Sequence, residues 1–128
     1  DLNHWTVGWI DWNLLLDERG GPNHVGNFCS APVLAAADRQ ALQFQSSYAA
    51  LGHFARFMQP GAQRVLCAAT REALECTAAV NPDGSVVVVV LNRSDAALPF
   101  SLRVGAHAAP LMLDAHALLT VQATPGEG

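Results

Sequence analysis

The chain has 128 residues, of which 51% are hydrophobic and 14% charged, a composition typical of a packed globular protein rather than a disordered segment. The formal net charge is -4 and no basic cluster is present, which argues against nucleic acid as a partner. The longest apolar run, residues 86–91, is too short to span a bilayer, so we expect a soluble protein with no transmembrane segment. The first residue is not methionine, and we expect the chain to be part of a longer protein.

The first predicted element is an extended strand over residues 2–13, where β-branched and aromatic residues are concentrated. At its end, Trp9 and Trp12 stand on either side of Asp11, and Asn13 follows. An indole ring beside carboxylate and amide groups suits a sugar, because the ring covers the apolar face of a pyranose while the polar groups bind its hydroxyls. The competing interpretation is that both tryptophans are core residues.

A turn is predicted at residues 20–23, GGPN, because both glycines can adopt a positive φ. Residues 33–37 are expected to form a short extended piece or a turn. Neither segment by itself indicates a function.

A helix is predicted over residues 45–59, because apolar side chains recur there every three or four residues. Ser46 or Ser47 is expected to cap its start, and Pro60 to stop it. Gly52 lies in its middle, where glycine is unfavourable, so close packing against a neighbour is expected there.

Six strands are predicted after the helix, each bounded by turn residues at the spacing typical of a β-sandwich. Their ranges are 65–69, 76–80, 85–91, 98–103, 109–113 and 117–121. The sequence NPDG at 81–84 predicts a hairpin, and the unbroken valines at 86–90 predict a strand covered on both faces. Pro99 predicts an edge strand, and residues 124–128 are expected to form a frayed tail.

Three cysteines, Cys29, Cys67 and Cys76, form no CxxC pair, so neither a zinc site nor a disulfide framework is expected. Cys67 and Cys76 could nevertheless lie opposite each other in a hairpin, which leaves open whether they pair. The Asn92-Arg93-Ser94 sequence fits a glycosylation acceptor, but a polar turn after a buried strand is the favoured interpretation.

Three separated motifs resemble, in order and spacing, the C-terminal part of the glucosylceramidases of glycoside hydrolase family 30. They are GWIDWNLLL at 8–16, GGPNHVGNF at 20–28 and NPDGSVVVVVLNRS at 81–94. The resemblance implies a mixed, mostly β fold. Residues 1–62 would hold the last strand of a (β/α)8 barrel, a small antiparallel-sheet excursion and the last barrel helix. Residues 63–128 would form an incomplete immunoglobulin-like antiparallel β-sandwich.

The same resemblance implies a role for four residues near the start of the chain. Trp12 would wall the glycon pocket and Asn27 would line the same cleft, with Asp11 as support behind the tryptophan and Phe28 at the rim. In the family, two glutamates on earlier barrel strands carry out retaining hydrolysis. No catalytic residue is therefore expected in this chain, and the chain alone is expected to be inactive.

The predicted function is the C-terminal part of a retaining β-glucosidase, similar to glucosylceramidase, that contributes one wall of the glycon pocket. The expected partners are a β-glucoside or glucosyl lipid substrate and the missing N-terminal barrel segment, with no cofactor and no metal. By family resemblance the protein would be secreted or lysosome-like. The alternative is a non-catalytic β-sandwich module that binds carbohydrate or a partner protein.

Overall fold

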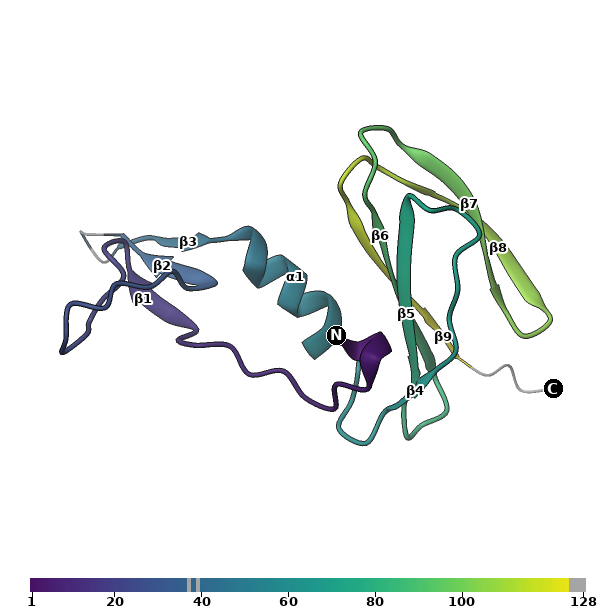
Figure 1. Ribbon diagram of the computed structural model, residues 1–128, viewed down its shortest axis with the longest axis horizontal. Helices are drawn as coiled ribbons and strands as arrows, with labels where there is room; N and C mark the ends of the chain where they lie inside the picture. The colour runs from purple at the N-terminus through teal and green to yellow at the C-terminus, as the bar shows by residue number, and fades with distance from the viewer. Residues whose placement is uncertain (37, 39, 125–128) are drawn as a thin grey trace. The chain divides into compact units, whose positions relative to one another are not determined.

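The computed structural model describes residues 1–36, 38 and 40–124, and within them it is mostly β with a single α-helix, as predicted (Figure 1). Two compact units are present, one formed by Thr6–Gly52 and the other by Asp1–Trp5 with His53–Gly128. Of the tail predicted at 124–128, residues 125–128 lie outside the described residues. The elements are η1 (Leu2–His4), β1 (Leu15–Asp17), β2 (Val33–Ala35), β3 (Leu42–Phe44), α1 (Ser46–Ala55), β4 (Gln63–Val65), β5 (Leu74–Val80), β6 (Val86–Asn92), β7 (Leu98–Val104), β8 (His107–Leu113) and β9 (Leu118–Ala123).

The prediction of a strand over residues 2–13 is wrong. Leu2–His4 form a short 3-10 helix, Trp5 follows with a φ of 69°, and residues 6–13 belong to no strand. Strand propensity is not enough to form a strand, because the backbone groups of an extended segment need a neighbouring strand as hydrogen-bond partner. Within the described residues no strand pairs with this segment.

The unit Thr6–Gly52 contains a small sheet in the order β1-β2-β3. β1 and β2 are parallel, with Leu15 opposite Val33, whereas β2 and β3 are antiparallel. The sheet is therefore mixed, and the prediction of a purely antiparallel excursion is wrong. The long connection between β1 and β2 accounts for the difference, because parallel neighbours need a connection that returns the chain to the same end of the sheet.

The helix α1 is shorter than predicted. The Tyr48 amide donates to the Gln45 carbonyl oxygen at 3.0 Å, so Gln45, rather than either serine, precedes the first turn. The helix ends at Ala55, well before Pro60, and the chain continues in turns. A Cβ atom at Gly52 would meet nothing within 4 Å, so the expected close packing at this glycine is not found among the described residues.

The C-terminal strands form a four-stranded sheet, β4-β5-β6-β9, and a two-stranded sheet, β7-β8 (Figure 1). The last five of the six predicted strands are confirmed. The first, β4, lies earlier in the chain than expected, at Gln63–Val65. The two sheets share a core cluster. Its buried members are Leu74, Ala78, Val88, Val90 and Leu113. β7 pairs only with β8 among the described strands, so the edge position predicted from Pro99 is confirmed.

The strand β6 is covered on both faces, as the run of valines predicts. Val87 is 0% exposed, and Val88–Val90 are each 3% exposed. Val88 and Val90 belong to the core cluster. On the opposite face, Val89 pairs with Thr120, whose Oγ1 lies 2.8 Å from His53 Nδ1 at the end of α1. The His53 side chain therefore contacts this second face.

The hairpin between β5 and β6 forms at the predicted place. The Gly84 amide donates to the Asn81 carbonyl oxygen at 2.9 Å, and Gly84 has a φ of 82°. The buried Asn81 side chain also contacts the segment after α1, since it donates to the Phe57 carbonyl oxygen and accepts from the Gln59 amide, both at 2.9 Å. One amide side chain thus joins the hairpin to the chain that leaves the helix.

A second buried amide, Asn92, lies at the end of β6 and is 0% exposed. Its Nδ2 donates to the carbonyl oxygens of Ala96, Leu113 and Asp114 at 2.7, 3.1 and 3.0 Å. Its Oδ1 accepts from the amide and hydroxyl of Ser94 at 2.9 and 2.8 Å. Every polar atom of this side chain is bonded within the fold, which favours the polar-turn interpretation over a glycan acceptor.

We predict that Asn92→Ala lowers the free energy of unfolding of the chain by about 2 to 4 kcal/mol, because it removes several hydrogen bonds and leaves buried carbonyl groups without a donor. Urea unfolding followed by circular dichroism measures this change. Ser94→Ala is the matched control, since it removes only the Ser94 hydroxyl, with its contacts to Asn92 Oδ1 and the Ala96 carbonyl oxygen, and keeps the Asn92 amide in place. If the two variants lowered the free energy of unfolding by equal and small amounts, the Asn92 hydrogen bonds would not have the proposed stabilising role.

The hairpin carboxylate provides a pH-dependent prediction. The Ser85 hydroxyl and amide donate to Asp83 Oδ1 at 2.6 and 2.9 Å, and these bonds lower the pKa of Asp83 below its usual value. A lowered pKa in the folded state stabilises the fold at pH values above the unfolded pKa, and the contribution disappears as pH falls through the folded pKa.

We therefore expect Asp83→Asn to lower the urea midpoint at pH 7, with the difference from the wild type shrinking as pH falls below about 4. Asp114→Asn is the control, because the Asp114 carboxylate accepts no hydrogen bond in the described part of the chain. A difference that is constant between pH 7 and pH 3 would show that the Asp83 charge does not contribute.

Candidate functional site

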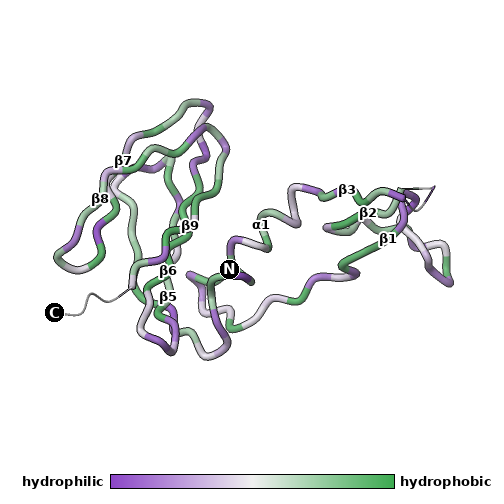
Figure 2. Tube along the Cα trace, turned by 180° about the vertical axis from the view of Figure 1, so that it is seen from behind, coloured by the Kyte–Doolittle hydropathy of each residue, from purple (hydrophilic) through white to green (hydrophobic). Residues whose placement is uncertain are grey.

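The segment that leads to β1 exposes large apolar side chains. Trp12 is 73% exposed and Trp9 is 63% exposed, and neither has a hydrogen bond or ring contact through its indole in the described residues. Figure 2 shows hydrophobic and hydrophilic residues alternating along this segment before β1. The interpretation of these tryptophans as core residues is therefore wrong for the chain as described.

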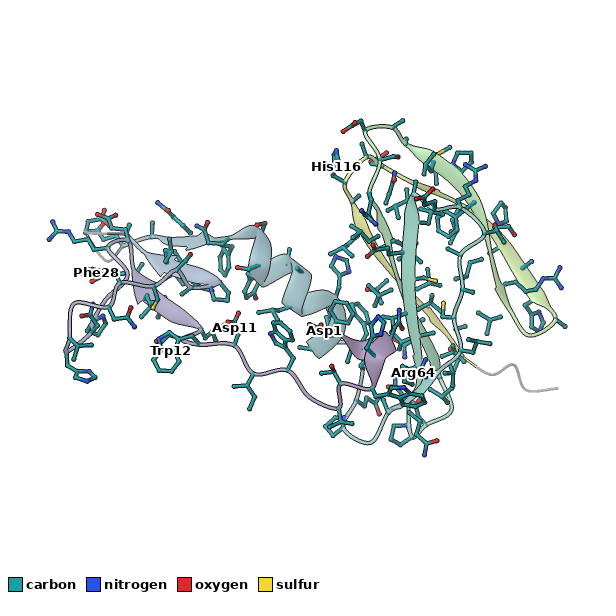
Figure 3. The ribbon with its side chains drawn as sticks, viewed as in Figure 1. Asp1, Asp11, Trp12, Phe28, Arg64 and His116 are labelled. Atoms are coloured by element: carbon teal, nitrogen blue, oxygen red, sulfur yellow. The ribbon has the colours of Figure 1, made fainter. Side chains whose placement is uncertain are left out.

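The backbone at Trp12 is held by its neighbour. The Trp12 amide donates to Asp11 Oδ1 at 2.8 Å, which fixes the bend at the point where the indole leaves the chain. Figure 3 shows Asp11 and Trp12 on the segment just before β1. The Asp11 carboxylate contacts the backbone of Trp12, so in this structure Asp11 acts as a local hydrogen-bond acceptor.

The loop between β1 and β2 is closed by a turn that Asp17 organises. Asp17 Oδ1 accepts the amides of Arg19 and Gly21 at 2.9 and 2.8 Å, and the Asp17 amide donates to the Gly21 carbonyl oxygen at 2.7 Å. Gly20 has a φ of 81°, and a Cβ atom there would lie 2.5 Å from the Cys29 carbonyl oxygen. Only glycine permits this close approach.

This turn sets the base of the loop that carries Asn27 and Phe28. The Cys29 amide donates to the Gly20 carbonyl oxygen at 3.4 Å, and Cys29 Sγ lies 3.7 Å from the Asn27 carbonyl oxygen. The Asn27 side chain is exposed, and Phe28 is 67% exposed. In Figure 3 Phe28 lies on this loop, after β1.

The four predicted site residues are thus all exposed and all lie in the unit Thr6–Gly52. Asp11 and Trp12 are in contact, whereas no hydrogen bond or ring contact joins Trp12 to Asn27 or Phe28 among the described residues. Their assignment to a sugar cleft stays a prediction. Asp17 is the residue whose role the sequence analysis missed, and its position shortly before two glycines is the signal for such a turn.

The acidic side chains of the chain form no metal site in the described residues, where no group of three His, Cys, Asp or Glu side chains is arranged to hold an ion. Glu75 pairs with Arg93 at 2.7 Å on the surface. Among the described residues no helix is long and apolar enough to cross a membrane.

Two models of one family match the chain in succession. The glycosyl hydrolase family 30 TIM-barrel domain matches residues 1–58, and the glycosyl hydrolase family 30 beta sandwich domain matches residues 61–121. The chain belongs to glycoside hydrolase family 30. The fold class predicted from the sequence, the end of a barrel followed by a β-sandwich, is confirmed with it.

Relatives of this family 30 chain include the lysosomal acid glucosylceramidase of Mus musculus, which is 43% identical over 103 residues. That alignment covers 80% of this chain and 20% of the mouse protein, so the chain spans about a fifth of the length of the relative. The predicted resemblance to glucosylceramidases is confirmed by this identity.

Solved structures show the same fold. The crystal structure of SrfJ from Salmonella typhimurium has a TM-score of 0.84 and 37% identity, covering 91% of this chain and 26% of that one. An endo-beta1,6-glucanase gives a TM-score of 0.90 at 24% identity over 98% of this chain and 28% of its own, and this second likeness supports the fold alone.

Proposed function

We propose that this chain is the C-terminal part of a retaining β-glucosidase that hydrolyses the glucosidic bond of a glucosyl lipid or a related β-glucoside. In this proposal the chain contributes one wall of the glycon pocket through Trp12 and Asn27. The observation that carries it is the 73% exposed Trp12 indole on a backbone fixed by Asp11, in a family 30 chain. An exposed ring held in one place is suited to stack on a sugar.

The hydrogen bonds and ion pairs of the chain's own carboxylates support the assignment of the catalytic groups to residues outside the chain. Retaining hydrolysis needs two carboxyl groups about 5 to 5.5 Å apart, one as nucleophile and one as acid and base. Asp11 and Asp17 accept backbone amides, and Glu75 pairs with Arg93. We therefore assign the two catalytic glutamates to the barrel segment that would precede this chain, and none to the chain itself.

The substrate class is inferred from the relatives. The mouse relative is named a lysosomal acid glucosylceramidase, which supports a glucosyl lipid as substrate and a lysosome-like or secreted location. Asp11 would support the Trp12 wall, and Phe28 would lie at the cleft rim.

We further propose that the functional division of the chain falls at residue 62, with 1–62 completing the barrel and 63–128 forming the sandwich domain. The family matches at 1–58 and 61–121 support this boundary.

The first test concerns the chain alone. We expect the 128-residue chain to release no product from an aryl β-glucoside, while the longer protein with the barrel segment hydrolyses it. Measurement of aryl release at matched concentrations compares the two. Turnover by purified chain would overturn the assignment of both glutamates to the missing segment. Saturable quenching of tryptophan fluorescence by glucosides, without turnover in either protein, would favour a carbohydrate-binding module instead.

The second test concerns the tryptophan in the longer enzyme. We expect Trp12→Ala to weaken glucoside binding by a few kcal/mol at most, through loss of one aromatic platform, and Trp12→Phe to retain part of the binding. Steady-state kinetics with an aryl β-glucoside measures KM and kcat. Trp9→Ala is the matched control, because Trp9 is a similarly exposed indole on the same segment. An unchanged KM and kcat for Trp12→Ala would remove Trp12 from the site.

A further inference from the structure

Two of the cysteines are brought together by the register of the sandwich. β4 ends with Val65 opposite Ala78 of the antiparallel β5. Continuing that register by two residues along each chain puts Cys67 opposite Cys76. Side chains two residues apart on an extended chain share a face, so both thiols are expected on the face that carries Val65 and Ala78.

The packing agrees with the register. Both cysteine side chains pack against the core cluster that contains Leu74 and Ala78. Burial and the neighbouring Cys76 thiol, which shares a hydrogen bond with it, raise the pKa of the Cys67 thiol to about 12. The register and the packing together indicate that the two thiols adjoin, although the β4–β5 ladder itself ends before Cys67.

The pair is also open to small reagents. Cys67 and Cys76 are both free and partly exposed, and both line a surface hollow that is also lined by His4, Arg71 and Glu72. Cross-strand neighbours have Cβ atoms about 4.5 to 5.5 Å apart, close to the spacing that a disulfide needs. No third metal-ligating side chain completes a metal site among the described residues. The chemistry that suits two adjoining thiols is disulfide exchange.

We propose that Cys67 and Cys76 form a dithiol modification site that is oxidised to a cross-strand disulfide by a small-molecule disulfide such as oxidised glutathione. The Cys76 thiolate attacks one sulfur of oxidised glutathione, the S–S bond breaks, and one glutathione leaves and takes up a proton. The Cys67 thiol then loses its proton to solvent and attacks the Cys76 sulfur, which releases the second glutathione. The two protein thiols lose two electrons, and oxidised glutathione gains them.

The order of these steps follows from the chemistry of Cys67. A thiol with a raised pKa is rarely ionised at neutral pH, so it is a poor first nucleophile. Cys67 can act in the second step because the mixed disulfide is held beside it at a high effective concentration. The exchange is expected to be faster at pH 9 than at pH 7, since the thiolate is the reacting form.

The test uses the arrangement of arginines, because trypsin places each cysteine on a different peptide. Cleavage after Arg64, Arg71 and Arg93 gives peptide 65–71 with Cys67 and peptide 72–93 with Cys76. The native chain is incubated with oxidised glutathione, free thiols are blocked with N-ethylmaleimide, and the non-reduced digest is analysed by mass spectrometry. We expect peptide 65–71 linked to peptide 72–93, and we expect the link to be lost on reduction.

Two variants and one condition make the outcome decisive. Cys29→Ser should leave the link intact, whereas Cys67→Ser should accumulate glutathione on Cys76, because the resolving thiol is absent. The same oxidation in urea should give a mixture that also links Cys29. The proposal is overturned if Cys67 and Cys76 of the native wild type are blocked or glutathionylated singly. It is also overturned if native and urea-treated chains give the same mixture of links.

Discussion

The sandwich depends on β6, which is paired with a strand along each edge and buried on both faces. The strand is hydrogen-bonded to β5 on one side and β9 on the other, and its valines at 87–90 are almost fully buried. Burying four such side chains is a large part of the driving force for folding, at roughly 1.5 to 3 kcal/mol per side chain. The other strands of the unit are placed by their relation to this one.

Two buried amides connect the loops to that central strand. Asn81 joins the β5–β6 hairpin to the segment that leaves α1, and Asn92 joins the end of β6 to the loop before β7 and the end of β8. A buried polar side chain is stable only when its hydrogen bonds are made, so each amide fixes the relative positions of several backbone segments. The polar residues at the two ends of β6 are therefore structural.

The candidate site has a different physical basis. Trp12 is exposed, and the positions of Trp12, Asn27 and Phe28 are set by local backbone hydrogen bonds of Asp11, Asp17 and Cys29. Such bonds fix where a side chain leaves the chain, but they do not bury it. In a family 30 chain that spans about a fifth of its mouse relative, an exposed and locally fixed indole is consistent with a surface completed by other residues.

Much of this protein was determined by the sequence alone. The hairpin at 81–84, the covered valine strand and the edge position of Pro99 follow from local turn chemistry and hydrophobic pattern, and three motifs in order identified the family. The strand expected at 2–13 and the antiparallel pairing of β1 failed, because strand formation depends on a partner that propensity does not specify. Only the tertiary structure decided that the Asn92 side chain is buried and bonded to three carbonyl oxygens, and that Cys67 and Cys76 adjoin, since both depend on how separate segments pack against one another.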